Sequence, residues 1–161
     1  MFNNIVIRYE GSWKNNLQEG KGVEVCPDGS RYEGEYLNGH KHGRGTYTWN
    51  DGSVYSGDFY LNKMHGKGTM RWTYGRRYEG DWLNDLMHGK GIFTWSDGRK
   101  YEGEYFKDLK QGKGIFEWPE VKKYNVEWIG GKQHGEGVFT SKRGKSKRGM
   151  WQDGTRIKWL D

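Results

Sequence analysis

The sequence is poor in cysteine, in aliphatic side chains and in long apolar runs, and each shortage excludes a class of structure. Its single cysteine, Cys26, rules out an internal disulfide and fits a reducing compartment. No window approaches the roughly 18 consecutive apolar residues of a membrane-spanning helix. The start, MFNNIVIRYE, lacks the basic and apolar regions of a secretory signal. We therefore expect a soluble, cytoplasmic protein.

Aromatic residues and glycine, by contrast, are abundant. Hydrophobic residues make up 32% and charged residues 30% of the chain, a balance that alone would favour disorder. Nine Trp, eleven Tyr and six Phe offset this balance, because large rings bury much surface per residue. The 27 glycines, against two prolines, supply many positions where φ can be positive, as tight turns require. We expect short strands joined by many turns.

The net charge of +6 is unevenly distributed. Residues 140–161 hold seven Lys/Arg against two Asp, whereas the first 139 residues hold 20 basic residues against 19 acidic ones. The densest basic run consists of Lys142, Arg143, Lys145, Lys147 and Arg148. Such a run could bind an anionic lipid surface, nucleic acid or an acidic protein tail, and a solvated loop explains it equally well. Nucleic acid is the least expected partner, since no aromatic stacking platform accompanies the run.

A period of 23 residues runs through the sequence. An aromatic residue lies two positions before a glycine at Tyr9, Tyr32, Tyr55, Tyr78 and Tyr101. The same step relates Trp13, Tyr36, Phe59, Trp82, Tyr105, Trp128 and Trp151, and also Trp49, Trp72, Trp95 and Trp118. So many independent positions agree on one period that chance is excluded.

Within each unit the aromatic and glycine positions are spaced by two, which places them on one face of a β-strand. Asp28-Gly29, Asp51-Gly52 and Asp97-Gly98 lie between such runs and predict tight type I′ turns. The second connection of each unit, as in residues 84–88, is expected to be longer and more polar. Two antiparallel strands per unit predict a continuous meander of about a dozen strands. Each glycine should leave room for a ring to lie across the sheet.

Several segments closely resemble the MORN (membrane occupation and recognition nexus) repeat: YEGEY at 32–36, HGRGTYTW at 42–49, YEGDW at 78–82, HGKGIFTW at 88–95 and YEGEY at 101–105. The resemblance implies an all-β fold, an elongated, twisted antiparallel β-sheet built from tandem 23-residue β-hairpins. An N-terminal edge segment over 1–8 would precede six repeats at 9–31, 32–54, 55–77, 78–100, 101–123 and 124–146. A partial seventh repeat and C-terminal cap would occupy 147–161.

The sixth repeat departs from this pattern. Tyr124-Asn125-Val126 stands where Tyr-Glu-Gly is expected, and the preceding turn, from Pro119 to Lys122, lacks Asp-Gly. We therefore expect irregular packing there. The resemblance also implies a scaffold that binds proteins, a homodimer formed through the sheet ends, disputed lipid binding, and cytoskeletal, ciliary or membrane-associated assemblies. Unpaired sheet edges, with apolar Ile5-Val6-Ile7 at one of them, favour the same self-association.

The aromatic ladder is the main candidate for a binding surface, because aromatic residues dominate interface hot spots. We expect a groove that receives an extended or helical segment of a protein partner. The predicted groove residues are Tyr32, Tyr36, Trp49, Tyr55, Phe59, Trp72, Tyr78, Trp82, Trp95, Tyr101, Tyr105 and Trp118.

Other constellations are given simpler interpretations. His42, His65, His88 and His134 occur once per repeat, roughly 9–10 Å apart, too far for one zinc ion, so we interpret them as turn residues with local hydrogen bonds. The Gly-x-Gly pairs lack the flanking residues of a phosphate loop. The acidic residues Glu33, Glu35, Glu79, Asp81, Glu102 and Glu104 are expected on a solvated face, and Cys26 as a small filler. No catalytic residue, cofactor or metal site is expected.

Two functions from different classes remain. The first is a non-enzymatic scaffold that binds a partner segment along the aromatic groove. The alternative is a peripheral module that binds anionic phospholipid through the basic run. A regulatory domain of an enzyme is disfavoured, because the repeats fill the sequence and leave no room for a catalytic domain.

Overall fold

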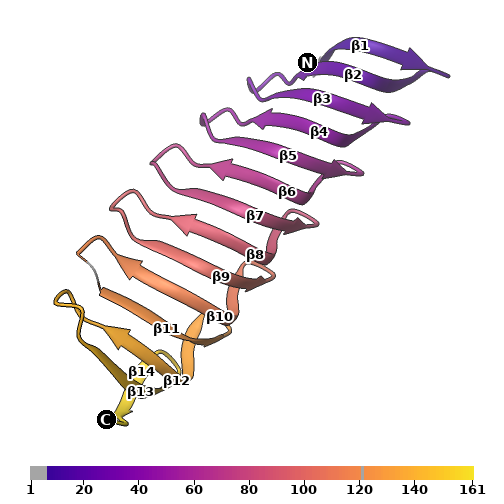
Figure 1. The fold of residues 1–161 in the computed structure, drawn as a ribbon. Coiled ribbons are helices and arrows are strands. Elements are labelled where there is room, and N and C mark those ends of the chain that lie inside the picture. Colours follow the sequence, from indigo (N-terminus) through magenta and orange to yellow (C-terminus); the bar gives the residue numbers. More distant parts are fainter. Residues whose placement is uncertain (1–6, 121) are drawn as a thin grey trace, which may run out of the picture. The chain divides into compact units, whose positions relative to one another are not determined.

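The computed structural model describes residues 7–120 and 122–161 (Figure 1). Over these residues the protein has fourteen β-strands and no helix, and so none long and apolar enough to cross a membrane. Each strand is an antiparallel neighbour of the next, in sequence order and without a crossover. The predicted all-β meander of tandem hairpins is confirmed. Of the predicted edge stretch, Ile5 and Val6 lie outside the described residues.

The strands fall into two compact units, divided within β7 (Arg77–Leu83). The first unit runs to Tyr74 and includes Trp82–Asp85, and the second holds Gly75–Asp81 and Leu86–Asp161. The other strands of the first unit are β1 (Arg8–Lys14), β2 (Leu17–Val25), β3 (Arg31–Leu37), β4 (His40–Thr48), β5 (Val54–Tyr60) and β6 (Lys63–Arg71). Those of the second are β8 (Leu86–Thr94), β9 (Lys100–Phe106), β10 (Leu109–Trp118), β11 (Lys122–Ile129), β12 (Lys132–Thr140), β13 (Ser146–Gln152) and β14 (Thr155–Trp159).

The tight turns lie where longer connections were predicted. Only Lys107 and Asp108 separate β9 from β10, and their φ values are 47° and 69°. Asn84 and Asp85, inside the segment predicted to be long, likewise have φ of 49° and 70°. Positive φ at both central residues is what a type I′ turn requires. The prediction was wrong because most of these pairs lack glycine, and Asn and Asp tolerate the left-handed region well enough to replace it.

Three Asp-Gly pairs, at residues 28–29, 51–52 and 97–98, instead lie in five-residue loops, whereas Asp153-Gly154 does form a two-residue turn. Between β2 and β3, only Gly29 of the Asp28-Gly29 pair has positive φ, at 89°. The Gly29 N–H donates to the Cys26 carbonyl at 3.0 Å, and the Ser30 N–H donates to Asp28 Oδ1 at 2.9 Å. The aspartate therefore caps the loop through its side chain, a common role of Asp in turns.

A tyrosine laid over two glycines forms the core of each regular repeat. Tyr101 is 0% exposed, and a Cβ atom on Gly114 of the neighbouring strand would lie only 2.3 Å from its hydroxyl. A Cβ atom on Gly103 would lie 2.6 Å from the same hydroxyl and from the Gly114 Cα. The hydroxyl donates to the Glu104 carbonyl at 3.1 Å, and Tyr32, Tyr55 and Tyr78 make the equivalent bond. The predicted role of glycine as space for a ring holds.

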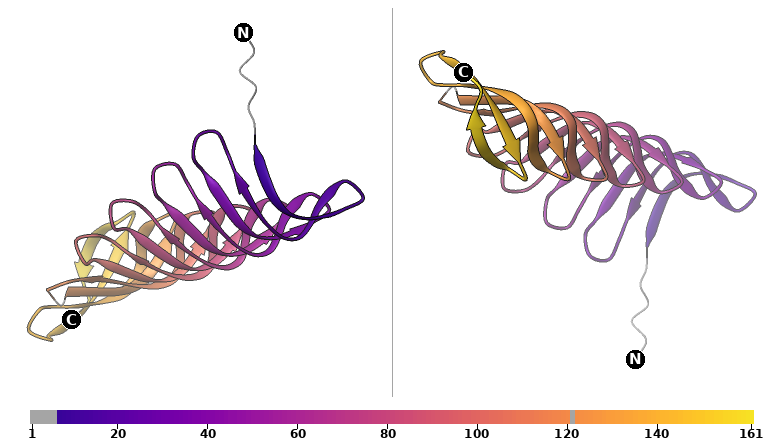
Figure 2. Two further views of the ribbon diagram at one scale, coloured as in Figure 1. Left: turned by 90° about the horizontal axis from the view of Figure 1, so that it is seen from above. Right: turned by 90° about the horizontal axis from the view of Figure 1, so that it is seen from below.

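Alternation along the strand gives each unit two chemically different faces. Tyr101, Gly103 and Tyr105 lie on what we call the aromatic face, and Glu102 and Glu104 lie on the opposite, charged face. The register shifts by a β-bulge between Gln111 and Gly114, where β10 pairs with β9. Bulges bend the strand that contains them, and Figure 2 shows strands that curve along their length.

Successive hairpins are joined by hydrogen bonds at their tight turns. The Asp108 N–H donates to the Met87 carbonyl at 2.9 Å, and the Met87 N–H donates to Asp108 Oδ1 at 2.7 Å. Asp85 and Met64 repeat this reciprocal pair at 3.0 and 2.8 Å. Each hairpin thus forms hydrogen bonds with backbone groups of the hairpin before it, so the stability of a repeat depends on its neighbour.

The sixth repeat packs differently, as its sequence predicts. Val126 fills the glycine position and is buried against Gly137, whose added Cβ atom would lie 2.7 Å from the valine Cβ. Tyr124 is only half-buried and packs edge-on against Trp118 and Trp151, at 5.4 and 5.7 Å. The valine occupies the space that the tyrosine ring takes in regular repeats. Val121, in the preceding turn, lies outside the described residues.

Candidate functional site

Eight of the twelve predicted groove residues lie in the core. The buried rings are Tyr32, Tyr36, Tyr55, Phe59, Tyr78, Trp82, Tyr101 and Tyr105. They contact one another edge to face, as Tyr78 does Tyr105 at 5.2 Å and Tyr55 does Trp82 at 5.3 Å. Burial raises the pKa of the Tyr32, Tyr36, Tyr55, Tyr78, Tyr101 and Tyr105 hydroxyls. These rings do not form an open groove, because a sheet without a covering layer uses them as its own core.

The four remaining tryptophans of the set are half-buried. Trp49, Trp72, Trp95 and Trp118 keep part of their surface accessible to solvent. Trp95 packs on Phe93 at 4.5 Å, and Trp118 packs on Phe116 at 4.4 Å. These tryptophans are the part of the predicted groove that a partner can reach.

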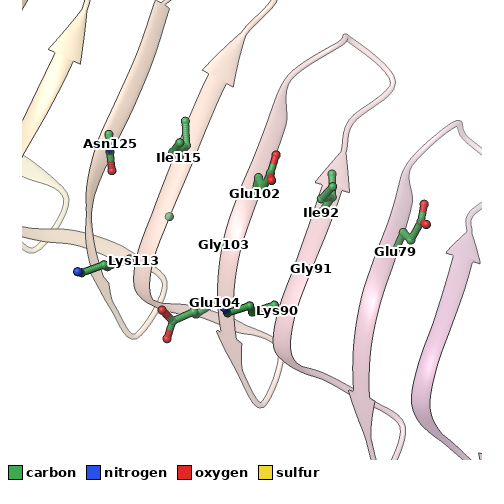
Figure 3. Close-up of a pocket in the computed structure, with 11 residues that line it drawn as sticks. Glu79, Lys90, Gly91, Ile92, Glu102, Gly103, Glu104, Lys113, Ile115 and Asn125 are labelled. Carbon is green, nitrogen blue, oxygen red and sulfur yellow. The ribbon is translucent and has the colours of Figure 1, made fainter.

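The charged face of the second unit carries a hollow of about 600 Å³ (Figure 3). Ile92 and Ile115 form its apolar floor. Glycine backbone separates these two isoleucines from the place where the strands bend. Charged and polar side chains rim it: Glu79, Lys90, Glu102, Glu104, Lys113 and Asn125. Two isoleucines ringed by charges of both signs give the hollow an apolar centre and a polar rim, an arrangement typical of protein interfaces.

The first unit has a counterpart of this hollow, also of about 600 Å³. Its lining residues occupy the same repeat positions three units of sequence earlier: Glu10, Lys21, Val23, Glu33, Glu35 and Arg44. Val23 takes the place of Ile92 at the floor. We call the two sites the first-unit and second-unit hollows. Their recurrence follows from the repeat, and the larger isoleucines give the second the more apolar floor.

The acidic residues expected on a solvated face do lie on the charged face, but several have structural partners. Glu33 pairs with Arg31 at 2.6 Å, and Glu102 pairs with Lys100 at 2.8 Å. Asp81 Oδ2 accepts the Lys90 N–H at 2.8 Å, and Asp58 Oδ2 accepts the Lys67 N–H at 2.8 Å beside the bulge where β5 pairs with β6. The prediction of a merely solvated face was incomplete, because a bulge leaves a backbone N–H that a nearby carboxylate can accept.

A row of exposed apolar side chains was not predicted. Leu37, Tyr60, Leu83, Phe106 and Ile129 each precede a tight turn, one per repeat, and all are exposed. Phe106 is 50% exposed and contacts the His88 ring at 5.2 Å. Alternation from Tyr105 places Phe106 on the charged face, the face of the hollow. The signal is the same 23-residue step, but the type of side chain varies at this position, whereas glycine and the buried aromatic residues recur.

The histidines are strand residues, not turn residues. His42, His65 and His88 lie in β4, β6 and β8, and Nδ1 of each is buried without a hydrogen-bond partner. His40 differs, since its Nδ1 lies 2.8 Å from Asn62 Nδ2. Nδ1 of these three rings does not make the predicted local hydrogen bond, and the rings pack against side chains such as Tyr60 and Phe106. Over residues 7–120 and 122–161, no three His, Cys, Asp or Glu residues group closely enough to hold a metal ion.

Cys26 is half-buried in the loop between β2 and β3. Burial, and then the negative charge of Glu24, raise the pKa of its thiol. A raised pKa lowers the fraction of thiolate, the nucleophilic form. The thiol therefore suits the filler role expected for it.

The basic run is exposed throughout. Lys142, Arg143 and Lys145 lie in the loop after β12, while Lys147 and Arg148 belong to β13. Lys142 Nζ is 3.4 Å from Glu120 and Arg148 Nε is 3.8 Å from Asp161, and all four side chains are at least half exposed. Such exposed ion pairs contribute little to stability and leave the basic side chains accessible to solvent.

Comparison with known proteins identifies the repeat. The MORN repeat family matches residues 9–31, 32–54, 55–73, 78–98, 101–120 and 127–146. Among solved structures, the chain is similar to the wild-type TCP10 domain of Danio rerio CPAP in complex with a peptide of Danio rerio STIL. The two share 14% identity over 92% of this chain and 72% of that chain, with a TM-score of 0.38. A search of curated protein sequences found no match. Since the six repeat matches span most of the sequence, the chain belongs to the MORN-repeat family.

Proposed function

We propose that this protein is a non-enzymatic scaffold that binds a segment of a partner protein on its charged face. The second-unit hollow carries this proposal. It exposes an apolar floor of Ile92 and Ile115 inside a rim of both charge signs. An extended or helical segment with apolar side chains flanked by charged ones fits such a surface.

The exposed apolar row supports the same face. Phe106 and Ile129 are both at least half exposed, and apolar side chains repeated along one edge can mark an interaction site. In contrast, the buried tyrosines of the aromatic face offer a partner little area. Of the twelve residues predicted for the groove, only Trp49, Trp72, Trp95 and Trp118 keep accessible surface, and a partner that contacts them does so at a place separate from the hollow.

The test is affinity capture from an extract of the source cells with the whole chain as bait. The double variant Ile92→Glu/Ile115→Glu places charge on the hollow floor. Ile157→Glu is the matched control, because Ile157 on β14 is equally apolar and 55% exposed. We expect the control to capture the same proteins as the unsubstituted chain, and the double variant to lose them while its strand circular dichroism persists. Equal capture by both variants would contradict the proposal.

A second candidate function is binding to anionic phospholipid through the basic run. The observation that favours it is the exposure of all five basic side chains. Each basic residue near an anionic membrane contributes about 1 kcal/mol, and this attraction is screened by salt. Substituting Lys142, Arg143, Lys145, Lys147 and Arg148 with Glu should remove binding to phosphatidylserine vesicles, while Ile92→Glu/Ile115→Glu should not. Vesicle binding that survives the five charge reversals would rule this candidate out.

We also propose that the protein acts in a cytoplasmic assembly of the cytoskeleton, cilium or a membrane, as a homodimer formed through the sheet ends. Edge strands such as β14 present unpaired backbone groups, which recruit further strands. Imaging of the tagged full chain in the source cells tests the location, and light scattering over a concentration series tests the dimer. A diffuse signal and a strict monomer would contradict the two parts respectively.

A further inference from the structure

Lys110, on β10, is surrounded by aromatic rings. Its Nζ atom lies 5.2 to 5.5 Å from the centroids of four of them, those of Trp95, Tyr101, Phe116 and Trp128. The lysine is half-buried. Across the described part of the chain, no carboxylate forms an ion pair with it. The ammonium group is thus partly removed from water and held by ring faces alone.

The first unit contains the same lysine with a counter-ion. Lys41 occupies the repeat position of Lys110 three units of sequence earlier, and its Nζ lies 5.3 Å from the Tyr32 ring centroid. It also donates to Glu24 Oε1 at 2.6 Å, in a pair whose side chains are 16% and 13% exposed. The residue at the Glu24 position of the later repeat is Phe93, a buried ring. The lysine is therefore repeated and its carboxylate is not.

The fold does not require a cation at this position. Met64 and Met87 occupy it in the two repeats between Lys41 and Lys110, on strands of the same length. A methionine side chain fills aromatic surroundings without the cost of removing a charge from water. A role in folding alone therefore leaves the presence of Lys110 unexplained.

The surroundings of Lys110 favour an anion. The Arg99 guanidinium carbon lies 5.5 Å from the Trp95 ring centroid, so two cations lie near one indole. Burial, and then the positive charge of Arg99, lower the pKa of the Lys110 ammonium. Asp97 pairs with Arg99 at 2.8 Å, but the two side chains remain 54% and 40% exposed, so this pair is weak. A carboxylate placed beside Lys110 would relieve both the repulsion and the loss of hydration.

We propose that Lys110, Arg99 and the half-buried Trp95 bind an acidic side chain of a partner protein. That side chain supplies to Lys110 the carboxylate that Glu24 supplies to Lys41. The occupant is a glutamate or aspartate within a peptide segment. This site lies on the aromatic face, since Lys110 pairs with Tyr105. It is therefore separate from the hollow and does not depend on binding there.

The test measures fluorescence anisotropy of a fluorescein-labelled hexaglutamate peptide, with a hexaglutamine peptide as the uncharged probe. The parent is the full chain with Lys142, Arg143, Lys145, Lys147 and Arg148 changed to Gln, so that the basic run does not bind the probe. We expect the parent to bind hexaglutamate and Lys110→Met to bind it about tenfold more weakly, since a hydrogen-bonded charge contributes about that factor. Lys41→Met is the matched control and should bind as the parent does.

Two further variants move the counter-ion. Phe93→Glu places a carboxylate where Glu24 stands in the first unit, and it should weaken peptide binding as strongly as Lys110→Met. Glu24→Phe removes the internal carboxylate from Lys41, but Ser30 and Cys26 stand at the Arg99 and Trp95 positions of that unit, so this variant should bind hexaglutamate as the parent does. If Phe93→Glu fails to fold, Lys110→Met still decides the matter, because methionine already occupies this position in two other repeats.

The outcomes separate this site from the hollow. Ile92→Glu/Ile115→Glu should leave hexaglutamate binding unchanged, even if it abolishes capture of a partner. Three results would overturn the inference: no binding of hexaglutamate by the parent, equal binding by the parent and Lys110→Met, or equal binding of hexaglutamine.

Discussion

The indole Nε1 of Trp82 donates a hydrogen bond to the carbonyl oxygen of Gly68 at 3.1 Å. The bond links β7 to a backbone carbonyl of β6, fourteen residues earlier in the sequence. Trp128 makes the same bond to Gly114 at 3.3 Å. Both indoles are buried, so the bond closes polar groups that water does not reach. Trp82 and Trp128 therefore join neighbouring hairpins as well as fill the core.

Trp82→Phe should lower the free energy of unfolding by about 1–3 kcal/mol, because it leaves the Gly68 carbonyl without this donor and removes ring volume. Phe59 occupies the same repeat position and is buried, so the variant should still fold. Denaturant unfolding followed by circular dichroism measures the change. Trp13→Phe, at an exposed copy of the position, should change stability by much less. Equal effects of the two substitutions would show that burial at Trp82 does not matter.

Gly91→Ala should destabilise the protein by at least about 1–3 kcal/mol, the usual cost of overpacking a core. Its Cβ atom would lie 2.3 to 2.4 Å from the hydroxyl and ring carbons of Tyr78. Gly52→Asn is the control, since that glycine has φ of 87° but no atom within 4 Å of an added Cβ, and Asn tolerates positive φ. A thermal melt of Gly91→Ala that matches the unsubstituted chain would refute the tyrosine-over-glycine packing.

Stability should fall as the pH rises above about 10, the ordinary pKa of tyrosine. Burial raises the pKa of Tyr55, Tyr78 and Tyr101 in the folded chain. A folded-state pKa above the unfolded value favours the neutral form, so its stabilisation is complete below the unfolded pKa and is lost as the pH rises through the folded one. Tyrosinate absorbance and strand circular dichroism should therefore change together. Reversible ionisation of every tyrosine with the sheet intact would contradict this.

Asp108→Ala should lower the free energy of unfolding by about 1 kcal/mol, because it leaves the Met87 N–H without its side-chain acceptor. Asp108→Asn keeps an oxygen at that place and should retain most of the stability, as Asn62 does for the Lys41 N–H at 2.8 Å. Hydrogen exchange at the Met87 amide measures the bond locally. Unchanged exchange in Asp108→Ala would show that this link between hairpins is not formed in solution.

Much of the fold could be predicted from the sequence, because the period of 23 and the spacing of two are set by local geometry. The steric role of glycine beside Tyr101 followed from the residue types alone. The turns could not be assigned correctly, since Asp28-Gly29 and Lys107-Asp108 suit more than one turn geometry. Which pair takes the tight turn depends on the register of the flanking strands, and that register is fixed by the tyrosine and glycine contacts between them.

The candidate site was harder to predict than the fold. A row of aromatic residues in a sequence is equally typical of a binding surface and of a core. Only the packing in the structure shows that Tyr78 and Trp82 belong to the core. Lys110 gave no local signal, because its surroundings come from residues between Trp95 and Trp128. The signal for Lys110 lies in a difference between repeats. Lys41 and Lys110 occupy the same repeat position, whereas Phe93 stands where the earlier repeat has Glu24.

Hydrogen exchange of the full chain with and without a captured partner tests the central claim most directly. Binding on the charged face predicts slower exchange in β8, β9 and β10, around Ile92, Glu102 and Ile115, and loss of that protection in Ile92→Glu/Ile115→Glu. Protection confined to the edge strand β14 or to the loop after β12, with none around the hollow, would contradict the account.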